Sequence, residues 1–187
     1  MFHVAKHETN YYPKPVLKGQ DILVLLKLID EPNGWTVRSV GEAVGLDPAG
    51  VHRALKRLGE ARLVDQERQR VNRSNAEEFL IHGLKYLFPI RQGGLIRGMP
   101  TAWAAPPLDS ELAPVDEPPP VWPDPKGKVR GVALEPLHEN APEVARKDSG
   151  VAERLALIDA IRLGDGRVRS LATKHLSESL RAGTNSR

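Results

Sequence analysis

The stretch over residues 35–64 constrains the fold more than any other, because it holds two short amphipathic segments separated by strong helix breakers. Gly45 stands where the residue after a helix adopts a positive φ angle, which glycine does without strain. Asp47 can accept hydrogen bonds from the free N–H groups of the next helix, and Pro48 suits that helix's first position. The sequence therefore predicts a helix, a tight turn and a second helix over 48–61.

The predicted helix over 48–61 has two different faces. Its apolar residues repeat at three-and-four spacing and would pack on the domain: Val51, Ala54, Leu55 and Leu58. The other side is basic and begins with small residues: Ala49, Gly50, His52, Arg53, Lys56 and Arg57. An apolar side for docking and a basic side with a small tip are typical of a recognition helix in the DNA major groove. The alternative is an ordinary helix pair whose charges are solvated.

The residues after this helix have the pattern of a β-hairpin. A strand is predicted over 63–67, followed by a basic turn and a return strand over 68–73. Such a hairpin would form a basic wing over 65–73 beside the DNA backbone. Its cations, together with the one just before it, are Arg62, Arg68, Arg70 and Arg73. Arg38 and Ser39 could reach a phosphate from the N-terminal end of the first helix of the pair, which is predicted over 37–44.

On these residues the chain resembles the winged helix-turn-helix transcriptional regulators of bacteria, especially the MarR-like type. The matching runs are VGEAVGL at 40–46, VHRALKRL at 51–58 and ARLV at 61–64. The family pattern usually has glycine where Arg62 stands, so the start of the wing differs here. The match covers residues 17–90. The resemblance implies a sequence-specific regulator that binds double-stranded DNA, and it names neither operator nor effector.

The segments on either side of this pair of helices complete the predicted domain. Residues 1–16 are expected to form an irregular N-terminal arm, because their prolines prevent a helix. Residues 19–30 form a helix that is apolar nearly all round and should therefore be buried on several sides, and Trp35 is expected in the core. A further helix follows Ser74, its candidate N-cap, and ends at Phe88-Pro89. In related regulators a helix here often builds the dimer contact, so a homodimer is expected.

Residues 91–150 are predicted to be a Gly/Pro-rich extended segment and linker. Eleven of the sixteen prolines lie between residues 100 and 142, and such a composition cannot form a core of its own. Around Trp103 the alternatives are a ligand pocket or partner surface, or a loop packed on the domain. Trp122, among prolines, predicts docking on a surface.

Residues 151–182 are predicted to be a C-terminal helical hairpin that turns at 164–166, followed by a polar tail over 183–187. A pair of helices of this size is too small to be stable alone. It must pack on the winged domain, on its copy in a dimer, or on another protein. The last possibility is the alternative functional hypothesis: a winged-helix antitoxin or adaptor whose residues 151–181 bind a partner protein.

Composition and motifs exclude several classes. With no cysteine there are no disulfides or thiolate metal sites, which suits the cytoplasm, and no apolar run is long enough to span a membrane. No metal or cofactor is expected, because the six histidines are scattered and no nucleotide-binding motif is present. Asp159 and Asp165, near Arg162 and Arg169, could in principle form an acid–base site, but surface ion pairs on a helix are the preferred interpretation. An enzyme is not expected.

The distribution of charge agrees with nucleic-acid contact in the N-terminal part. Residues 1–105 carry 15 Lys/Arg against 11 Asp/Glu, residues 106–150 carry 5 against 9, and residues 151–187 carry 7 against 4. The predicted fold class is mainly α with a small β-hairpin wing: a winged helix-turn-helix domain over 17–90 plus the C-terminal helical hairpin.

Overall fold

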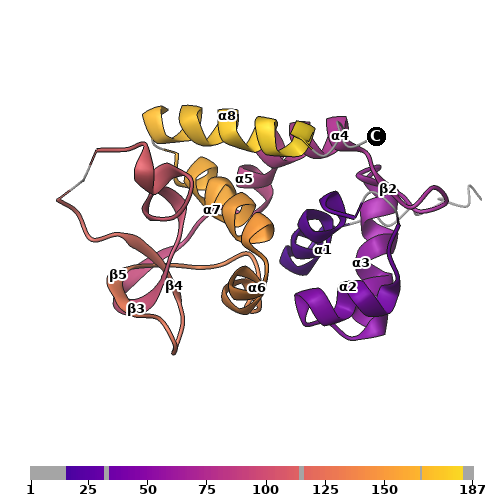
Figure 1. The fold of residues 1–187 in the computed structure, drawn as a ribbon, viewed down its shortest axis with the longest axis horizontal. Coiled ribbons are helices and arrows are strands. Elements are labelled where there is room, and N and C mark those ends of the chain that lie inside the picture. The colour runs from indigo at the N-terminus through magenta and orange to yellow at the C-terminus, as the bar shows by residue number, and fades with distance from the viewer. Residues whose placement is uncertain (1–15, 32–33, 114–115, 165, 183–187) are drawn as a thin grey trace, which may run out of the picture.

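The computed structural model describes residues 16–31, 34–113, 116–164 and 166–182 of the 187-residue chain (Figure 1). Within these ranges the fold is mainly helical, with a two-stranded hairpin and a separate three-stranded sheet. The predicted N-terminal arm lies outside the described residues except for Val16, and the predicted tail over 183–187 lies outside them entirely.

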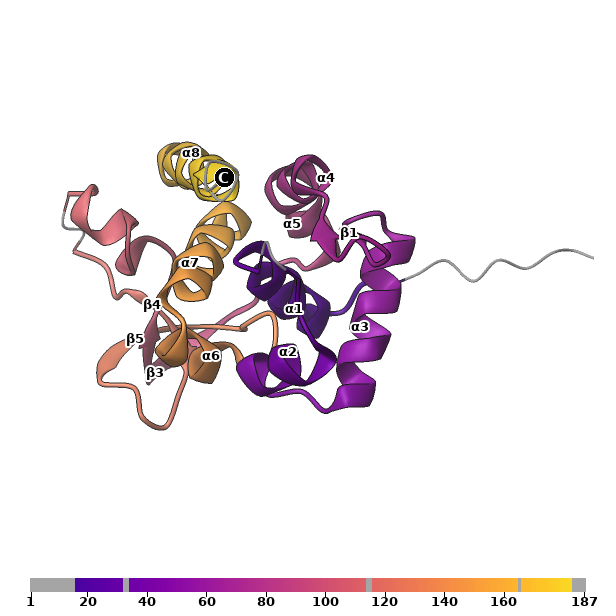
Figure 2. The ribbon, with the colours of Figure 1, turned by 45° about the vertical axis from the view of Figure 1, so that its right-hand side comes forward.

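Helix α1 (Gly19–Ile29) lies at the centre of the molecule. Both views show it between α3 (Pro48–Glu60) on one side and α7 (Ser149–Leu163) on the other (Figures 1 and 2). Residues 22–26 are completely buried, and Leu28 and Ile29 nearly so. The prediction of a helix buried on several sides is confirmed, because a helix that is apolar all round needs neighbours on every face. Trp35 is also buried, as expected.

The turn between α2 (Val37–Val44) and α3 follows the predicted local chemistry. The backbone N–H of Ser39 donates to Thr36 Oγ1 at 3.0 Å, which caps the start of α2. Gly45 ends α2 with φ of +70°. Asp47 caps α3 by accepting from the N–H of Gly50, and Pro48 occupies the first position. The helix–turn–helix pattern read from the sequence is confirmed at this level.

The predicted hairpin is present but short. Strands β1 (Val64–Asp65) and β2 (Arg70–Val71) pair antiparallel, with Val64 opposite Val71 and Asp65 opposite Arg70. Arg62 precedes the hairpin with φ of +58°. This left-handed conformation is one that glycine adopts more easily than a residue with a side chain, and an arginine adopts it here.

The helix after the hairpin begins two residues earlier than a Ser74 cap implies. Asn72 is the N-cap, and its side chain accepts from the N–H of Asn75 at 3.2 Å. Helix α4 (Arg73–Glu78) continues through a π-helical turn (Phe79–Gly83) into α5 (Leu84–Leu87). The segment contacts α7 and α8 (Gly166–Ala182) of the same chain, and its buried residues are Ala76, Leu80, Ile81 and Leu84. The apolar face that was expected to form a dimer contact is therefore covered within the chain, and a homodimer stays a prediction.

The prediction of an extended linker over 91–150 is wrong. Strands β3 (Gln92–Pro100), β4 (Pro120–Pro123) and β5 (Val129–Leu134) form a small closed sheet, in which β3 pairs antiparallel with both others and β4 pairs parallel with β5. Gly98 and Gly131 allow the closure, because a Cβ there would overlap the carbonyl oxygens of Trp122 and Pro119. Gly98 and Gly131, two of the glycines behind the linker prediction, are thus positions of close strand approach.

Two short 3₁₀ turns, Ala102–Ala104 and Leu108–Ser110, and helix α6 (Ala141–Lys147) connect this sheet to the rest. Trp103 is partly buried against the hydrophobic core, and Trp122 is 2% exposed, which confirms the expected docking of that side chain.

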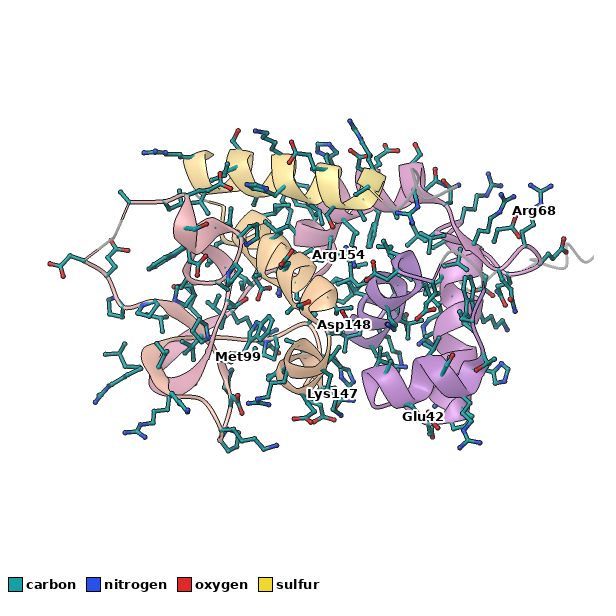
Figure 3. The ribbon with its side chains drawn as sticks, in the orientation of Figure 1. Glu42, Arg68, Met99, Lys147, Asp148 and Arg154 are labelled. Carbon is teal, nitrogen blue, oxygen red and sulfur yellow. The ribbon has the colours of Figure 1, made fainter. Side chains whose placement is uncertain are left out.

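Helices α7 and α8 form the predicted C-terminal hairpin, and Gly164 turns between them with φ of +88°. Helix α7 starts at Ser149, two residues before the predicted start, because Asp148 accepts from the N–H of Val151 and caps it. Arg154 and Asp148 lie on the side of α7 that faces α1 (Figure 3). There Arg154 donates to both carboxylate oxygens of Asp30, at 2.6 and 2.7 Å. The hairpin thus packs on the N-terminal helices, the first of the three predicted options.

Candidate nucleic-acid interface

The outward side of α3 is the most exposed basic helix face near the α2–α3 turn. Figure 2 shows α3 along one edge of the molecule. Its buried residues are Gly50, Val51, Ala54, Leu55 and Leu58, and they pack toward α1, α2 and β1. Ala49, His52, Arg53 and Lys56 are exposed on the other side. Within the described part of the chain, none of the elements packed on α3 covers these four residues.

The cations on this face are held only weakly by the chain's own carboxylates. The closest contact of Arg53 is with Asp47, and that of Lys56 is with Glu60, both at 4.0 Å. Arg53 and Lys56 side chains are 62% and 76% exposed. Exposed pairs at such distances contribute little free energy. Both cations can therefore turn toward a phosphate or a base edge without losing a strong contact.

Two residues predicted for this face have internal roles instead. Arg57 donates to Asp21 from Nε at 2.7 Å and from Nη2 at 2.6 Å, and its side chain is only 16% exposed. It joins α3 to the start of α1. Gly50 is buried, and its N–H is bound by the Asp47 cap. Both therefore leave the list of DNA contacts, because their polar groups already have partners inside the fold.

The hairpin contributes less positive charge than its sequence suggests. Arg68 is 70% exposed and extends outward from the turn between β1 and β2 (Figure 3), but its Nε lies 3.7 Å from Asp65. Arg70 is exposed and forms no ion pair within the described residues. Glu67 is exposed on the same turn. Arg68 and Arg70 are thus balanced by two carboxylates, those of Asp65 and Glu67. The predicted wing is therefore close to neutral in net charge.

Arg73 is partly buried, and its guanidinium binds within the fold. The predicted contact of Arg73 with DNA is therefore wrong. Its guanidinium donates to the carbonyl of Leu180 at 2.5 Å and to the carbonyl of Ile29 at 2.8 Å. Burial and the nearby Arg154 guanidinium lower the pKa of Arg73. This arginine ties α4 to the ends of α1 and α8, since the last carbonyl groups of a helix need donors from elsewhere.

The remaining predicted contacts lie at the edges of the α3 face. Arg38 is exposed and donates to Glu42 at 2.8 Å. Ser39 is exposed, but its hydroxyl already donates to the Thr36 carbonyl at 3.0 Å as part of the cap of α2. Arg62 is exposed and makes no ion pair among the described residues. Arg38 and Arg62 thus have exposed guanidiniums, whereas the hydroxyl of Ser39 serves the fold.

A second polar cluster is buried behind the three-stranded sheet. Asp159 accepts from Thr101 Oγ1 at 2.9 Å, from Trp122 Nε1 at 2.6 Å and from Arg162 at 2.6 Å. The side chains of Asp159 and Arg162 are 2% and 3% exposed, so the preferred interpretation as a surface ion pair is wrong. Burial raises the pKa of the Asp159 carboxyl, against the opposing effects of Arg162, Trp122 and Thr101.

The geometry of this cluster indicates a structural role. Both carboxylate oxygens of Asp159 have donors, and Arg162 also donates to the carbonyl of Phe88 at 2.9 Å. The group has no free position for a substrate, and it joins the sheet and the end of α5 to α7. Within the ranges that the structure describes, no three His, Asp or Glu residues are grouped as a metal site would need.

One contact that sequence reasoning missed connects the C-terminal part to the α2–α3 turn. Asn140, just before α6, donates to the carbonyls of Val44 and Gly45 at 3.1 and 2.9 Å. These are terminal carbonyls of α2, which need donors from outside the helix. A lone Asn 95 residues further along the chain carries no pattern that could have indicated this contact.

Comparisons with known proteins give no assignment: no family model, curated protein or solved structure matches this chain. Across the described residues, no helix combines the length and the apolar character needed to cross a bilayer.

Proposed function

We propose that this protein is a sequence-specific DNA-binding transcriptional regulator of the winged helix-turn-helix type, with α3 as its recognition helix and the β1–β2 hairpin as its wing. The observation that carries the proposal is the exposed side of α3, where the small Ala49 near the start of the helix is followed by His52, Arg53 and Lys56. A basic helix face that follows a tight helix–turn–helix and packs by its opposite side has the geometry for the major groove.

The accessible residues divide by the kind of contact that they would make. Near the start of α3, Ala49 permits close approach to base edges, and His52 and Arg53 can donate to acceptors such as guanine N7 and O6. Lys56, Arg62, Arg68 and Arg70 lie further along α3 or at the hairpin, where contacts to phosphates would supply affinity without selectivity. Because the hairpin is close to neutral, α3 carries most of the proposed interface.

The alternative is an antitoxin or adaptor that holds a partner protein through 151–181. It was based on a helical hairpin whose apolar face needed something to pack against, and this face packs within the chain itself. The inward stripe of α8, Ala172, Leu176 and Leu180, is buried, and the side chain of Ser177 donates to Glu77 of α4 at 2.6 Å. We therefore propose a binding protein whose C-terminal helices support the DNA-binding part, and not an enzyme, because both carboxylate oxygens of the buried Asp159 already have donors within the fold.

The proposal is tested with the full chain and a pool of double-stranded DNA with a randomised central region. Successive rounds of binding and amplification should enrich one sequence, and fluorescence anisotropy should then measure its affinity as a function of salt. Arg53→Ala should weaken binding to that sequence by about 1–3 kcal/mol and relax the base preference. Arg70→Ala should weaken binding to all sequences alike and reduce the salt slope by about 1.

A matched control is Lys174→Ala on α8, which removes an exposed cation that makes no ion pair among the described residues. It should leave affinity and salt slope unchanged. The proposal fails if the folded wild-type chain enriches no sequence, or if Arg53→Ala behaves like Lys174→Ala. An unchanged salt slope for Arg70→Ala would remove only the hairpin from the interface. The expected homodimer is checked separately by sedimentation of the free protein.

A further inference from the structure

A cavity of about 380 Å³ lies between the three-stranded sheet and the start of α7. Its walls are formed by the end of β3, the 3₁₀ turns after it, β4, α6 and α7, and Met99 marks its strand side (Figure 3). Most of the lining is apolar, and much of that is alanine. On α7, Ala152 and Ala156 face it, where longer side chains would fill the space. A volume of this size accommodates a small organic molecule.

The aromatic wall of the cavity is held in a fixed orientation. Trp122 lines it and is 2% exposed, and its ring nitrogen donates to Asp159 at 2.6 Å on the buried side. Because that hydrogen bond and the surrounding core hold the ring, the small part of Trp122 that reaches the cavity is immobile.

The charged groups of the cavity all have the same sign. Asp109, on the second 3₁₀ turn, and Glu153, on α7, both line it, and both are exposed. Neither forms an ion pair or a side-chain hydrogen bond within the described residues. No lysine, arginine or histidine is among the residues that line the cavity. Two carboxylates without partners therefore border an apolar, aromatic space that contains no compensating positive charge.

We propose that this cavity binds a small organic cation with an apolar body, of the class of aryl-substituted ammonium compounds. The alanines, Met99 and the fixed Trp122 border the apolar part of the ligand, and Asp109 and Glu153 balance its charge. A neutral apolar molecule would gain nothing from the two carboxylates, which are exposed to water, and an anion would be repelled by them. Charge and shape thus select the same class of ligand.

The cavity also borders the segment that reaches the α2–α3 turn. Ala145 of α6 forms part of its wall, and Asn140 at the start of α6 binds the carbonyls that end α2. Ser149 lines the cavity next to Asp148, which pairs with Lys27 of α1 at 3.1 Å. An effect of the ligand on DNA binding would depend on the proposed function. Binding of the ligand to the cavity does not depend on it.

Isothermal titration of the full chain with benzyltrimethylammonium tests the proposal without any DNA, so its failure and that of the proposed function are distinguishable. Two probes separate the parts of this ligand: tetramethylammonium has the charge without the aromatic body, and benzyl alcohol has an aromatic body without the charge. Benzyltrimethylammonium should bind with a Kd at least about tenfold lower than either.

Variants locate the binding. Replacing both carboxylates, Asp109→Asn with Glu153→Gln, should raise the Kd by about tenfold, since two exposed charge contacts are lost. Ala152→Leu should abolish binding by filling the cavity, with its unfolding midpoint measured to show that it folds. Glu78→Gln on α4 removes an exposed carboxylate that does not line the cavity and should leave the Kd unchanged.

Three results would overturn the proposal: no saturable binding of benzyltrimethylammonium below about 10 mM, equal affinity for benzyl alcohol, or an unchanged Kd in the double carboxylate variant. In the last case the cation binds elsewhere on the molecule.

Discussion

Arg57 of α3 donates two hydrogen bonds, at 2.7 and 2.6 Å, to the carboxylate of Asp21 near the start of α1. Asp21 is completely buried, and it also accepts from the backbone N–H of Lys18 at 2.8 Å. A forked guanidinium on a carboxylate fixes orientation as well as distance. This pair therefore sets the angle at which α3 lies on α1, and with it the direction of the exposed α3 face.

Arg57→Ala should destabilise the fold by about 3 kcal/mol or more, because it leaves the carboxylate of Asp21 buried without its charged partner. Urea unfolding followed by circular dichroism measures this. Arg53→Ala, four residues earlier on the same helix but exposed, serves as the control and should change the unfolding free energy by less than about 0.5 kcal/mol. Equal stability of the two variants would contradict the structural role of Arg57.

Arg62→Gly should stabilise the fold. Its φ of +58° is unfavourable for a residue with a side chain by about 1 kcal/mol, and glycine adopts it freely, although glycine also gives the unfolded chain more freedom. The net gain expected in thermal unfolding is a few tenths to about 1 kcal/mol. If Arg62 contacts phosphate as proposed, the same variant binds DNA more weakly, so stability and affinity change in opposite directions. Arg62→Ala, which keeps the strain, should weaken DNA binding without the gain in stability.

Thr101→Val should cost about 1–3 kcal/mol of unfolding free energy, because the two side chains have nearly the same shape and only the hydrogen bond to the buried Asp159 is lost. Thr173→Val on α8 is the matched control, since its side chain makes no hydrogen bond within the described residues. A loss as large in Thr173→Val as in Thr101→Val would show that the hydroxyl at position 101 is not the cause.

Asp148→Asn should reveal a pH-dependent contribution to stability. Burial would raise the pKa of Asp148, but the N–H of Val151, Lys27 and Arg154 together lower it below its usual value. A carboxyl whose folded pKa is lowered stabilises the fold above its unfolded pKa, and this contribution disappears as the pH falls through the folded pKa. Asparagine still caps α7, so the variant removes only the charge.

The expected difference in unfolding free energy between wild type and Asp148→Asn is about 1 kcal/mol at pH 7, and it should shrink below about pH 4. Denaturant unfolding at a series of pH values measures it, with the exposed Asp116→Asn as the control. A difference that stays constant between pH 7 and pH 3 would contradict the assignment.

The sequence by itself determined the elements whose cause is local. Gly45 with its positive φ, Asp47 as the cap of α3, the apolar stripe of α3 and the turn at Gly164 were all readable, because each depends on groups within a few residues of one another. The exposure of His52, Arg53 and Lys56 followed from the same helical spacing.

Only the tertiary structure decided which polar side chains are internal. In the sequence, Arg57 and Arg73 cannot be distinguished from the exposed arginines near them. The partners that make them internal lie 36 to 107 residues away. The strands over 91–134 were hidden for a related reason: glycines and prolines that normally mark a linker here permit three strands to pack closely, and their register depends on distant partners. Local pattern reports what a segment can form, whereas burial and pairing depend on which distant segment it meets.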